Sequence, residues 1–205
     1  MGEMGIIEYK GFDIKLFQDE SPESPREWDN LGTMMCFHPG YNLGDKHNMS
    51  IEEMLETVRR RDVLALPLVL LDHSGLWMKV GSGWSEDPGG WDTSKVGFIW
   101  VTYSRLREEY KVRRISHQTL IHAENVLRSE VSTYSDYLKG SVYGYEVVDK
   151  DGEWIDSFWG FYGDEGYKET IRQGKASIDN IVDSELYQRV LGPQIPLFKE
   201  KEVGV

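Results

Sequence analysis

Alternating hydrophobic and polar positions predict a series of β-strands. Residues 12–17 alternate Phe, Ile and Leu with Asp and Lys, which is the period of two expected of a half-buried strand. Asp151-Gly152, between two such runs, is the strongest hairpin signal in the chain. Eight strands are predicted in all: residues 6–9, 12–17, 32–37, 66–71, 76–80, 96–103, 142–148 and 154–161.

Other segments carry a helical period with capping residues. Ser50 followed by Glu53 predicts a capping box at the start of one helix. Ser104 is expected to cap a short helix that ends near Tyr110. The longest helix is predicted to run from Ser116 to Lys139, followed by a left-handed Gly140, and its apolar spacing places Leu127 in the core. Two further helices are expected between residues 165 and 190.

These elements do not alternate regularly between strand and helix, which argues against a doubly wound parallel fold. The sequence predicts an α+β fold, a mainly antiparallel sheet with hairpins, packed by one long helix and several shorter helices. Residues 1–205 are expected to form a single domain, with a frayed tail over 191–205.

Composition limits the class of protein and the compartment in which we expect it. Hydrophobic residues make up 40% of the 205 and aromatic residues 12%, enough for a sizeable core. Cys36 is the only cysteine, so no internal disulfide can form. No apolar run approaches the roughly 20 residues that span a bilayer. We therefore expect a cytoplasmic protein with no membrane contact and no cofactor.

The formal net charge is −12, which repels nucleic-acid phosphates and attracts basic surfaces. The simplest consequence is solubility. The acids concentrate in a loop over residues 19–30, whose two prolines restrict its freedom. We identify this loop as a candidate surface for a basic partner, formed by Asp19, Glu20, Glu23, Glu27, Trp28 and Asp29.

A second candidate surface is a glycine-rich loop over residues 81–91. Glycine lets the backbone approach a partner closely, and tryptophan offers a large contact area at low entropic cost. The alternative is that the tryptophans fold this loop onto the core. The candidate contacts are Trp84, Glu86, Asp87 and Trp91.

Catalytic and metal-binding patterns are weaker. Asp72-His73-Ser74 has the residue types of a hydrolase triad, but adjacent residues cannot adopt triad geometry among themselves. A turn is the simpler interpretation. A fallback enzyme site would combine His38, Asp72, His73 and Asp92. Metal ligands could come from Cys36, His38, Asp45 and His47, but this spacing matches no standard site, and no metal is expected.

Two basic clusters stand out against the acidic background. One is Arg59-Arg60-Arg61, and the other extends over residues 105–114. A nucleic-acid patch is possible there, but Glu108 and Glu109 could pair with these bases. With the net charge, this makes direct nucleic-acid binding the weaker expectation.

Several longer stretches are distinctive as a set. They are residues 23–34 (ESPREWDNLGTM), 36–38 with 41–45, 71–75 (LDHSG), 91–99 (WDTSKVGFI), 143–145 and 156–163 (DSFWGFYG). In these stretches the chain resembles a family of uncharacterised proteins carried by bacterial phages, plasmids and conjugative elements, over most of residues 5–165. Genes in that setting often encode inhibitors of host defence nucleases, including anti-CRISPR and antirestriction proteins.

Three functions remain open. The first is a non-enzymatic inhibitor that binds a basic, nucleic-acid-handling host protein through acidic and aromatic surface, by mimicry of DNA or by locking a conformation. The second is a small hydrolase acting on a nucleotide or nucleic acid. The third is a self-associating structural or regulatory protein. Convergence of the fallback residues in one pocket would favour the enzyme.

Overall fold

The computed structural model describes residues 2–85, 87 and 89–191, with side chains placed as far as residue 184. It has an α+β fold with two antiparallel four-stranded sheets, which confirms the predicted fold class. The Glu86 candidate contact and most of the predicted frayed tail lie outside the described residues. Among the helices that are described, none has the length and hydrophobicity to cross a membrane.

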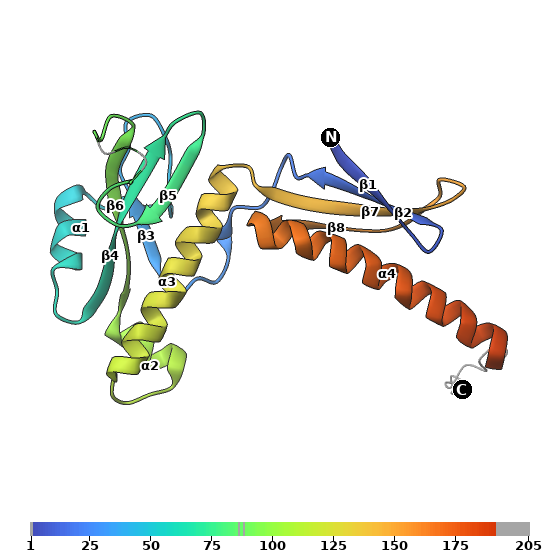
Figure 1. The fold of residues 1–205 in the computed structure, drawn as a ribbon. Coiled ribbons are helices and arrows are strands. Elements are labelled where there is room, and N and C mark those ends of the chain that lie inside the picture. The colour runs from blue at the N-terminus through green and yellow to red at the C-terminus, as the bar shows by residue number, and fades with distance from the viewer. Residues whose placement is uncertain (1, 86, 88, 192–205) are drawn as a thin grey trace, which may run out of the picture.

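The first sheet combines strands from early and late in the chain and has the strand order β1-β2-β7-β8. One face is covered by α4, and Ile14, Tyr145 and Ile178 are buried between them (Figure 1). We call this sheet and helix the first lobe. Its elements are β1 (Glu3–Tyr9), β2 (Phe12–Gln18), β7 (Val142–Asp149), β8 (Trp154–Tyr162) and α4 (Gly163–Leu191).

The second sheet has the order β3-β6-β4-β5 and forms the second lobe with three helices. The helix α3 covers one face, and α1 packs on the other around Met35, Met54 and Trp100. Its elements are β3 (Thr33–Cys36), α1 (Ile51–Val58), β4 (Val63–Asp72), β5 (Leu76–Val80), β6 (Thr93–Thr102), α2 (Tyr103–Tyr110) and α3 (His117–Leu138).

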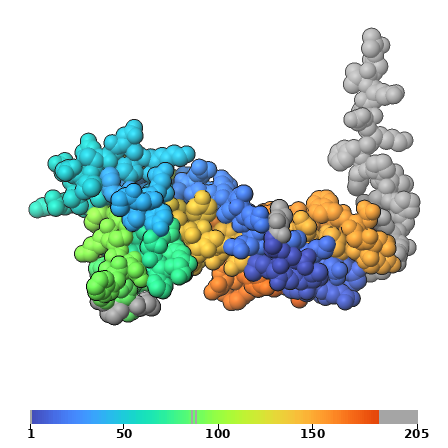
Figure 2. Space-filling model, turned by 90° about the horizontal axis from the view of Figure 1, so that it is seen from above, coloured from blue at the N-terminus to red at the C-terminus, as the bar shows by residue number. Residues whose placement is uncertain are grey.

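The two lobes lie side by side along an elongated molecule (Figure 2). Residues 19–32 lead from β2 to β3, and residues 139–141 return from α3 to β7. The two connections touch, since Asp19 N–H donates to the Val142 carbonyl at 2.8 Å and the Gln18 amide donates to the Gly140 carbonyl at 2.7 Å. The acidic loop therefore lies at the junction of the lobes. Whether both lobes fold as one domain stays a prediction.

Several local predictions are confirmed. Ser50 and Glu53 form the capping box of α1, Gly140 has the left-handed φ of +71° after α3, and β7 and β8 form a hairpin. The N-cap of α2 was predicted at Ser104, two residues too late. The Thr102 side chain accepts the hydrogen bond instead, because β6 ends there and the helix begins directly at Tyr103.

The prediction of two helices between residues 165 and 190 was wrong. A single helix, α4, runs through that segment and is longer than α3, which was predicted to be the longest. Glycine in a helix usually weakens it. Here Gly174 permits close packing, because a Cβ at this position would lie 2.8 Å from Cγ2 of Ile14. The glycine thus serves contact with the sheet rather than ending the helix.

A substitution of Leu127 tests which face of α3 packs against the second sheet. Its side chain is fully buried against the second sheet. Leu127→Ala should lower the free energy of unfolding by roughly 2–5 kcal/mol, because it removes buried methyl groups and leaves a cavity. Ile121→Ala, at a largely exposed position of the same helix, is the matched control and should cost little. Equal effects in chemical denaturation would show that the buried face has been misassigned.

Candidate functional site

The acidic loop is anchored from within by a buried arginine. The Arg26 side chain is 4% exposed and lies in the short 3₁₀ helix η1 (Pro25–Glu27). Its Nε donates to Asp45 Oδ1 at 2.7 Å, and Nη2 donates to Asp45 Oδ2 at 3.1 Å. Nη1 donates to Glu130 Oε2 at 3.1 Å, and Nη2 also reaches the Gly32 carbonyl at 2.7 Å. One cation therefore connects the loop, residues 38–49 and α3.

The two carboxylates have further partners. Glu130 accepts hydrogen bonds from the backbone of Leu31 and Gly32, and Asp45 accepts one from Met34 N–H at 2.8 Å. Burial alone would lower the pKa of the Arg26 guanidinium, but hydrogen bonds and charge from Asp45 and Glu130 outweigh it and raise that pKa. The Arg26 guanidinium thus stays charged, and the cluster fixes the start of β3.

With Arg26 turned inward, other loop side chains face solvent. Glu23, Glu27 and Asp29 are exposed, Asp29 to 95%. Trp28 is 43% exposed and contacts the Tyr162 ring edge-on, with ring centroids 5.2 Å apart. Glu20 is exposed as well, while Asp19 is half-buried. The six predicted contacts thus remain on one segment, which is held by both lobes.

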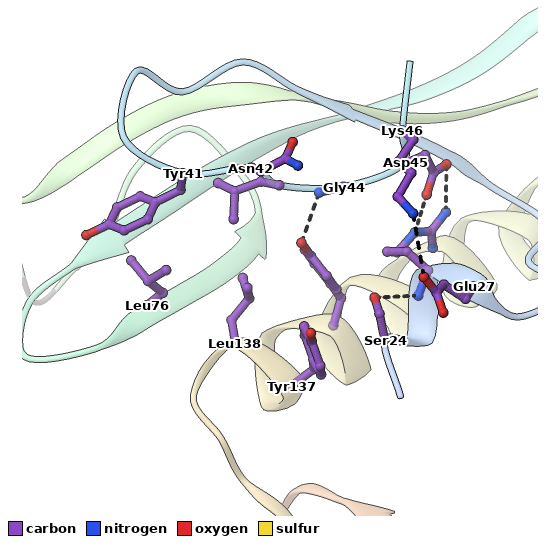
Figure 3. A pocket seen from close by; sticks show the side chains of 13 residues that line it. Ser24, Glu27, Tyr41, Asn42, Gly44, Asp45, Lys46, Leu76, Tyr137 and Leu138 are labelled. Atoms are coloured by element: carbon purple, nitrogen blue, oxygen red, sulfur yellow. Dashed lines mark hydrogen bonds and ion pairs between the residues drawn. The ribbon is translucent and has the colours of Figure 1, made fainter. Parts of the chain in front are cut away.

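A hollow of about 480 Å³ adjoins this loop. It opens between the loop, residues 41–46 and the end of α3 (Figure 3). Tyr41, Leu76 and Leu138 line one side, and the Gly44 N–H donates to the Tyr134 hydroxyl at 2.9 Å within it. The mixed polar and aromatic lining suits a side chain of a partner better than a large apolar ligand.

The loop's charge also reaches its neighbours. Burial is the main reason that the pKa of Tyr162 rises to about 12, and the negative charges of Glu23 and Asp19 add to it. The phenol therefore stays neutral and donates to the Glu23 carbonyl. Lys46 lies 3.9 Å from Glu27, and Arg105 lies 3.3 Å from Asp29. Both pairs are largely exposed, so they contribute little to stability.

The glycine-rich loop combines a packed and an exposed tryptophan. The Trp84 ring is half-buried and lies 4.1 Å from Lys79 Nζ, whereas Trp91 is 91% exposed. Asp87 organises the loop, since its carboxylate accepts hydrogen bonds from Trp91 N–H, Asp92 N–H and the Thr93 hydroxyl. The bond from Thr93 is the main reason that the pKa of Asp87 is lowered.

The fallback enzyme residues gather near one end of the second sheet. His73 Nδ1 lies 2.8 Å from Asp92 Oδ2, and the Tyr41 hydroxyl donates to Asp72 Oδ2 at 2.7 Å. The His38 ring stacks on Tyr41 with centroids 4.9 Å apart. His38 borders one hollow, whereas the His73 side chain is 69% exposed on the turn after β4.

The candidate metal ligands have other roles. Asp45 binds Arg26, and His47 Nε2 lies 3.3 Å from the Cys36 carbonyl. Within the part of the chain that the structure describes, no group of three or more His, Cys, Asp or Glu side chains could hold a metal ion. Burial, with the negative charge of Asp45, raises the pKa of the Cys36 thiol to about 12. That thiol is therefore a poor source of a thiolate ligand.

The pairing of Arg26 with Glu130 was not predicted from the sequence. In the sequence Arg26 is the single base of the acidic loop, and Glu130 lies about a hundred residues away on α3. A lone arginine among acids and next to Pro25 was the available signal. Comparisons with protein families, curated proteins and solved structures find no match to this chain. The resemblance to proteins of mobile elements thus stays a prediction.

Proposed function

We propose that the chain is a non-enzymatic binding protein that inhibits a nucleic-acid-targeting defence protein of a bacterial host, of the anti-CRISPR or antirestriction type. The acidic loop at the junction of the lobes carries the proposal. Its exposed carboxylates and Trp28 present negative charge beside an aromatic ring. A groove that holds DNA or RNA is basic, and such a surface complements it. The setting comes from the family resemblance.

Anchoring of the loop supports binding. Arg26 fixes the loop backbone through Gly32, and Tyr162 fixes it through Glu23. A segment that is ordered before binding loses less conformational entropy when a partner arrives. Trp28 has its edge-on contact with Tyr162 already in place, so it can act as a rigid anchor. The hollow beside the loop offers a place for one partner side chain.

Charge reversal in the loop tests the proposal. The chain would be expressed in bacteria carrying an active defence nuclease, with a panel of CRISPR effectors and restriction enzymes, and the plating efficiency of a targeted phage measured. We expect the wild type to raise it for at least one system. Glu20, Glu23 and Glu27 changed together to lysine should abolish most of that effect, because attraction to a basic groove becomes repulsion.

The matched control changes Glu52, Glu56 and Glu108 to lysine. These three side chains are exposed in the second lobe, and the net charge rises by the same amount. The control should retain inhibition, and with the purified target the loop variant should associate more slowly, chiefly at low salt. Equal loss in both triple variants would reduce the effect to overall charge, and full activity of the loop variant would exclude the loop as the interface.

A hydrolase is the second candidate, because the pairs His73–Asp92 and Tyr41–Asp72 lie at the same end of the sheet. A carboxylate that orients a histidine is a recurring part of general-base sites. Both side chains of the first pair are largely in solvent, however, and such sites usually exclude water. His73→Ala in the same phage assay separates the candidates, since only an enzyme should lose its effect.

A further inference from the structure

Two basic clusters that are distant in the sequence meet at one end of the second lobe. Val63, at the start of β4, pairs with Thr102 at the end of β6, so the turn before β4 lies beside the start of α2. Tyr103 N–H donates to the Asp62 carbonyl at 2.8 Å across this contact. The positive charge of Arg107 also contributes to the lowered pKa of Asp62, after the hydrogen bond from Arg60.

Among the described residues, most cations at this end form no ion pair. Arg60 pairs with Asp62 at 2.6 Å, and Arg105 pairs with Asp29 and Glu109. The other six are exposed, and the described part of the chain provides no ion pair for them at 4 Å or less. We call these six the basic end: Arg59, Arg61, Arg107, Lys111, Arg113 and Arg114.

The basic end opposes the charge of the rest of the molecule. Residues 59–62 and 105–114 contain eight bases and three acids, in a chain whose formal net charge is −12. Net charge averages over the whole surface, but at physiological salt a charge acts over roughly 8 Å. The first lobe extends away from α2, so its acids are remote from this end (Figure 1). The acidic loop reaches it through Asp29, whose charge is paired with Arg105. The local field at the basic end is therefore positive.

The turn between α2 and α3 holds part of this surface rigidly. Lys111 has a left-handed φ of +53° and caps α2, with its N–H donating to the Arg107 carbonyl. Val112 N–H donates to the same carbonyl at 3.1 Å, and Ser116 caps α3 shortly afterwards. Arg113 and Arg114 are thus presented between two capped helices. Cations on a fixed turn lose less freedom on binding than cations on a free tail.

We propose that the basic end binds the phosphate backbone of duplex nucleic acid, without reading its sequence. Five of the six cations are arginines, whose planar guanidinium can form paired hydrogen bonds to phosphate oxygens. An anionic membrane fits less well, because a surface helix needs an exposed apolar face, and none of the large exposed hydrophobic side chains lies in either segment. This site uses no residue of the acidic loop.

The test is fluorescence anisotropy with a fluorescein-labelled DNA duplex of about 20 base pairs, a length that spans several phosphates on each strand. We expect a Kd of roughly 10⁻⁶–10⁻⁴ M at physiological salt, and tighter binding at low salt. The logarithm of the association constant should fall with the logarithm of salt at a slope of about −3 to −5, since each phosphate contact contributes about −0.9.

Arg113→Glu with Arg114→Glu should weaken binding at least tenfold and make that slope shallower by about 2. The control is Lys15→Glu with Lys150→Glu, which gives the same net charge from two first-lobe lysines and should stay within twofold of wild type. Circular dichroism checks folding, and Arg113→Ala with Arg114→Ala replaces the variant if the double Glu change unfolds the chain.

Three results would overturn the proposal: no salt-dependent binding by the wild type, equal weakening in variant and control, or binding to vesicles of phosphatidylcholine and phosphatidylserine in place of the duplex. The phage assay on the acidic loop is separate, so a failure here leaves the proposed inhibitor untouched. Conversely, a loop variant that loses inhibition should still bind the duplex.

Discussion

Replacing Arg26 with alanine should lower the free energy of unfolding by about 3–5 kcal/mol, the usual cost of removing one partner from a buried ion pair. The reason is the position of its partners. Asp45 and Glu130 have side chains that are 24% and 11% exposed, so removal of the cation leaves two carboxylates close together and poorly solvated. Their mutual repulsion and lost solvation act in the same direction.

The matched control is Arg105→Ala. That arginine also pairs with an acid of the loop, Asp29, but in solvent, and exposed pairs contribute about 0–1 kcal/mol. Urea denaturation followed by tryptophan fluorescence measures both variants. Arg26→Lys should fall between them, because an ammonium cannot form the paired bonds to Asp45. A loss below about 1 kcal/mol for Arg26→Ala would contradict a structural role for the cluster.

The same variant bears on function. If Arg26 orders the acidic loop, its loss should weaken partner binding even where the protein remains folded, because the loop would then have to be ordered during binding. Adding Glu130→Gln to Arg26→Ala removes one of the unpaired charges and should restore part of the stability. Restored stability without restored binding would separate the loop's conformation from the stability of the fold.

Local signals were sufficient for most elements of this fold. Asp151-Gly152 specified a hairpin, and Gly152 has the left-handed φ of +83° that this turn requires. Ser50 and Glu53 specified a helix start, because each satisfies the other's backbone. Such features depend on neighbours within a few residues, and the sequence displays those neighbours directly.

The sequence does not show in the same way which distant strands pair with each other. In the first sheet β2 pairs with β7, more than a hundred residues later, so that the second lobe is inserted between them. Alternation states which face of a strand is buried but not which strand lies beside it. The division of eight strands into two sheets therefore emerged only from the structure, as did the meeting of Arg26 with Glu130.

Among the candidate sites, exposed charged residues were easier to predict from the sequence than the ion pairs that they form. The acids of residues 19–30 were recognised because exposed charge is visible in composition, and Glu23, Glu27 and Asp29 are indeed exposed. Glu108 and Glu109 were possible partners for the bases of residues 105–114. In the structure Glu109 pairs with Arg105, and the described residues provide no ion pair within 4 Å for Arg107. Helical spacing alone could not decide between these partners.

Cys36 should be almost inert to alkylation in the folded protein. Burial is the main cause that raises its thiol pKa from 9.0 to about 12, with a contribution from the charge of Asp45. The thiolate is the reactive form, so the raised pKa lowers its fraction at pH 8 by roughly two to three orders of magnitude. Labelling by iodoacetamide, followed by mass spectrometry, should be at least about 100-fold slower than in concentrated urea.

The direction of the shift also fixes the pH dependence. A raised thiol pKa means that the folded state favours the neutral thiol, so folding gains from this group below the unfolded pKa and loses that gain as the pH rises through 9 toward 12. Labelling should therefore stay slow up to about pH 9 and then increase as unfolding becomes easier.

A chelator provides the control. It should not alter the labelling rate if the thiol is simply buried, whereas faster labelling after chelation would restore Cys36 as a metal ligand. Native labelling within tenfold of the rate in urea would show instead that the cluster around Met34 and Tyr134 does not shield the thiol.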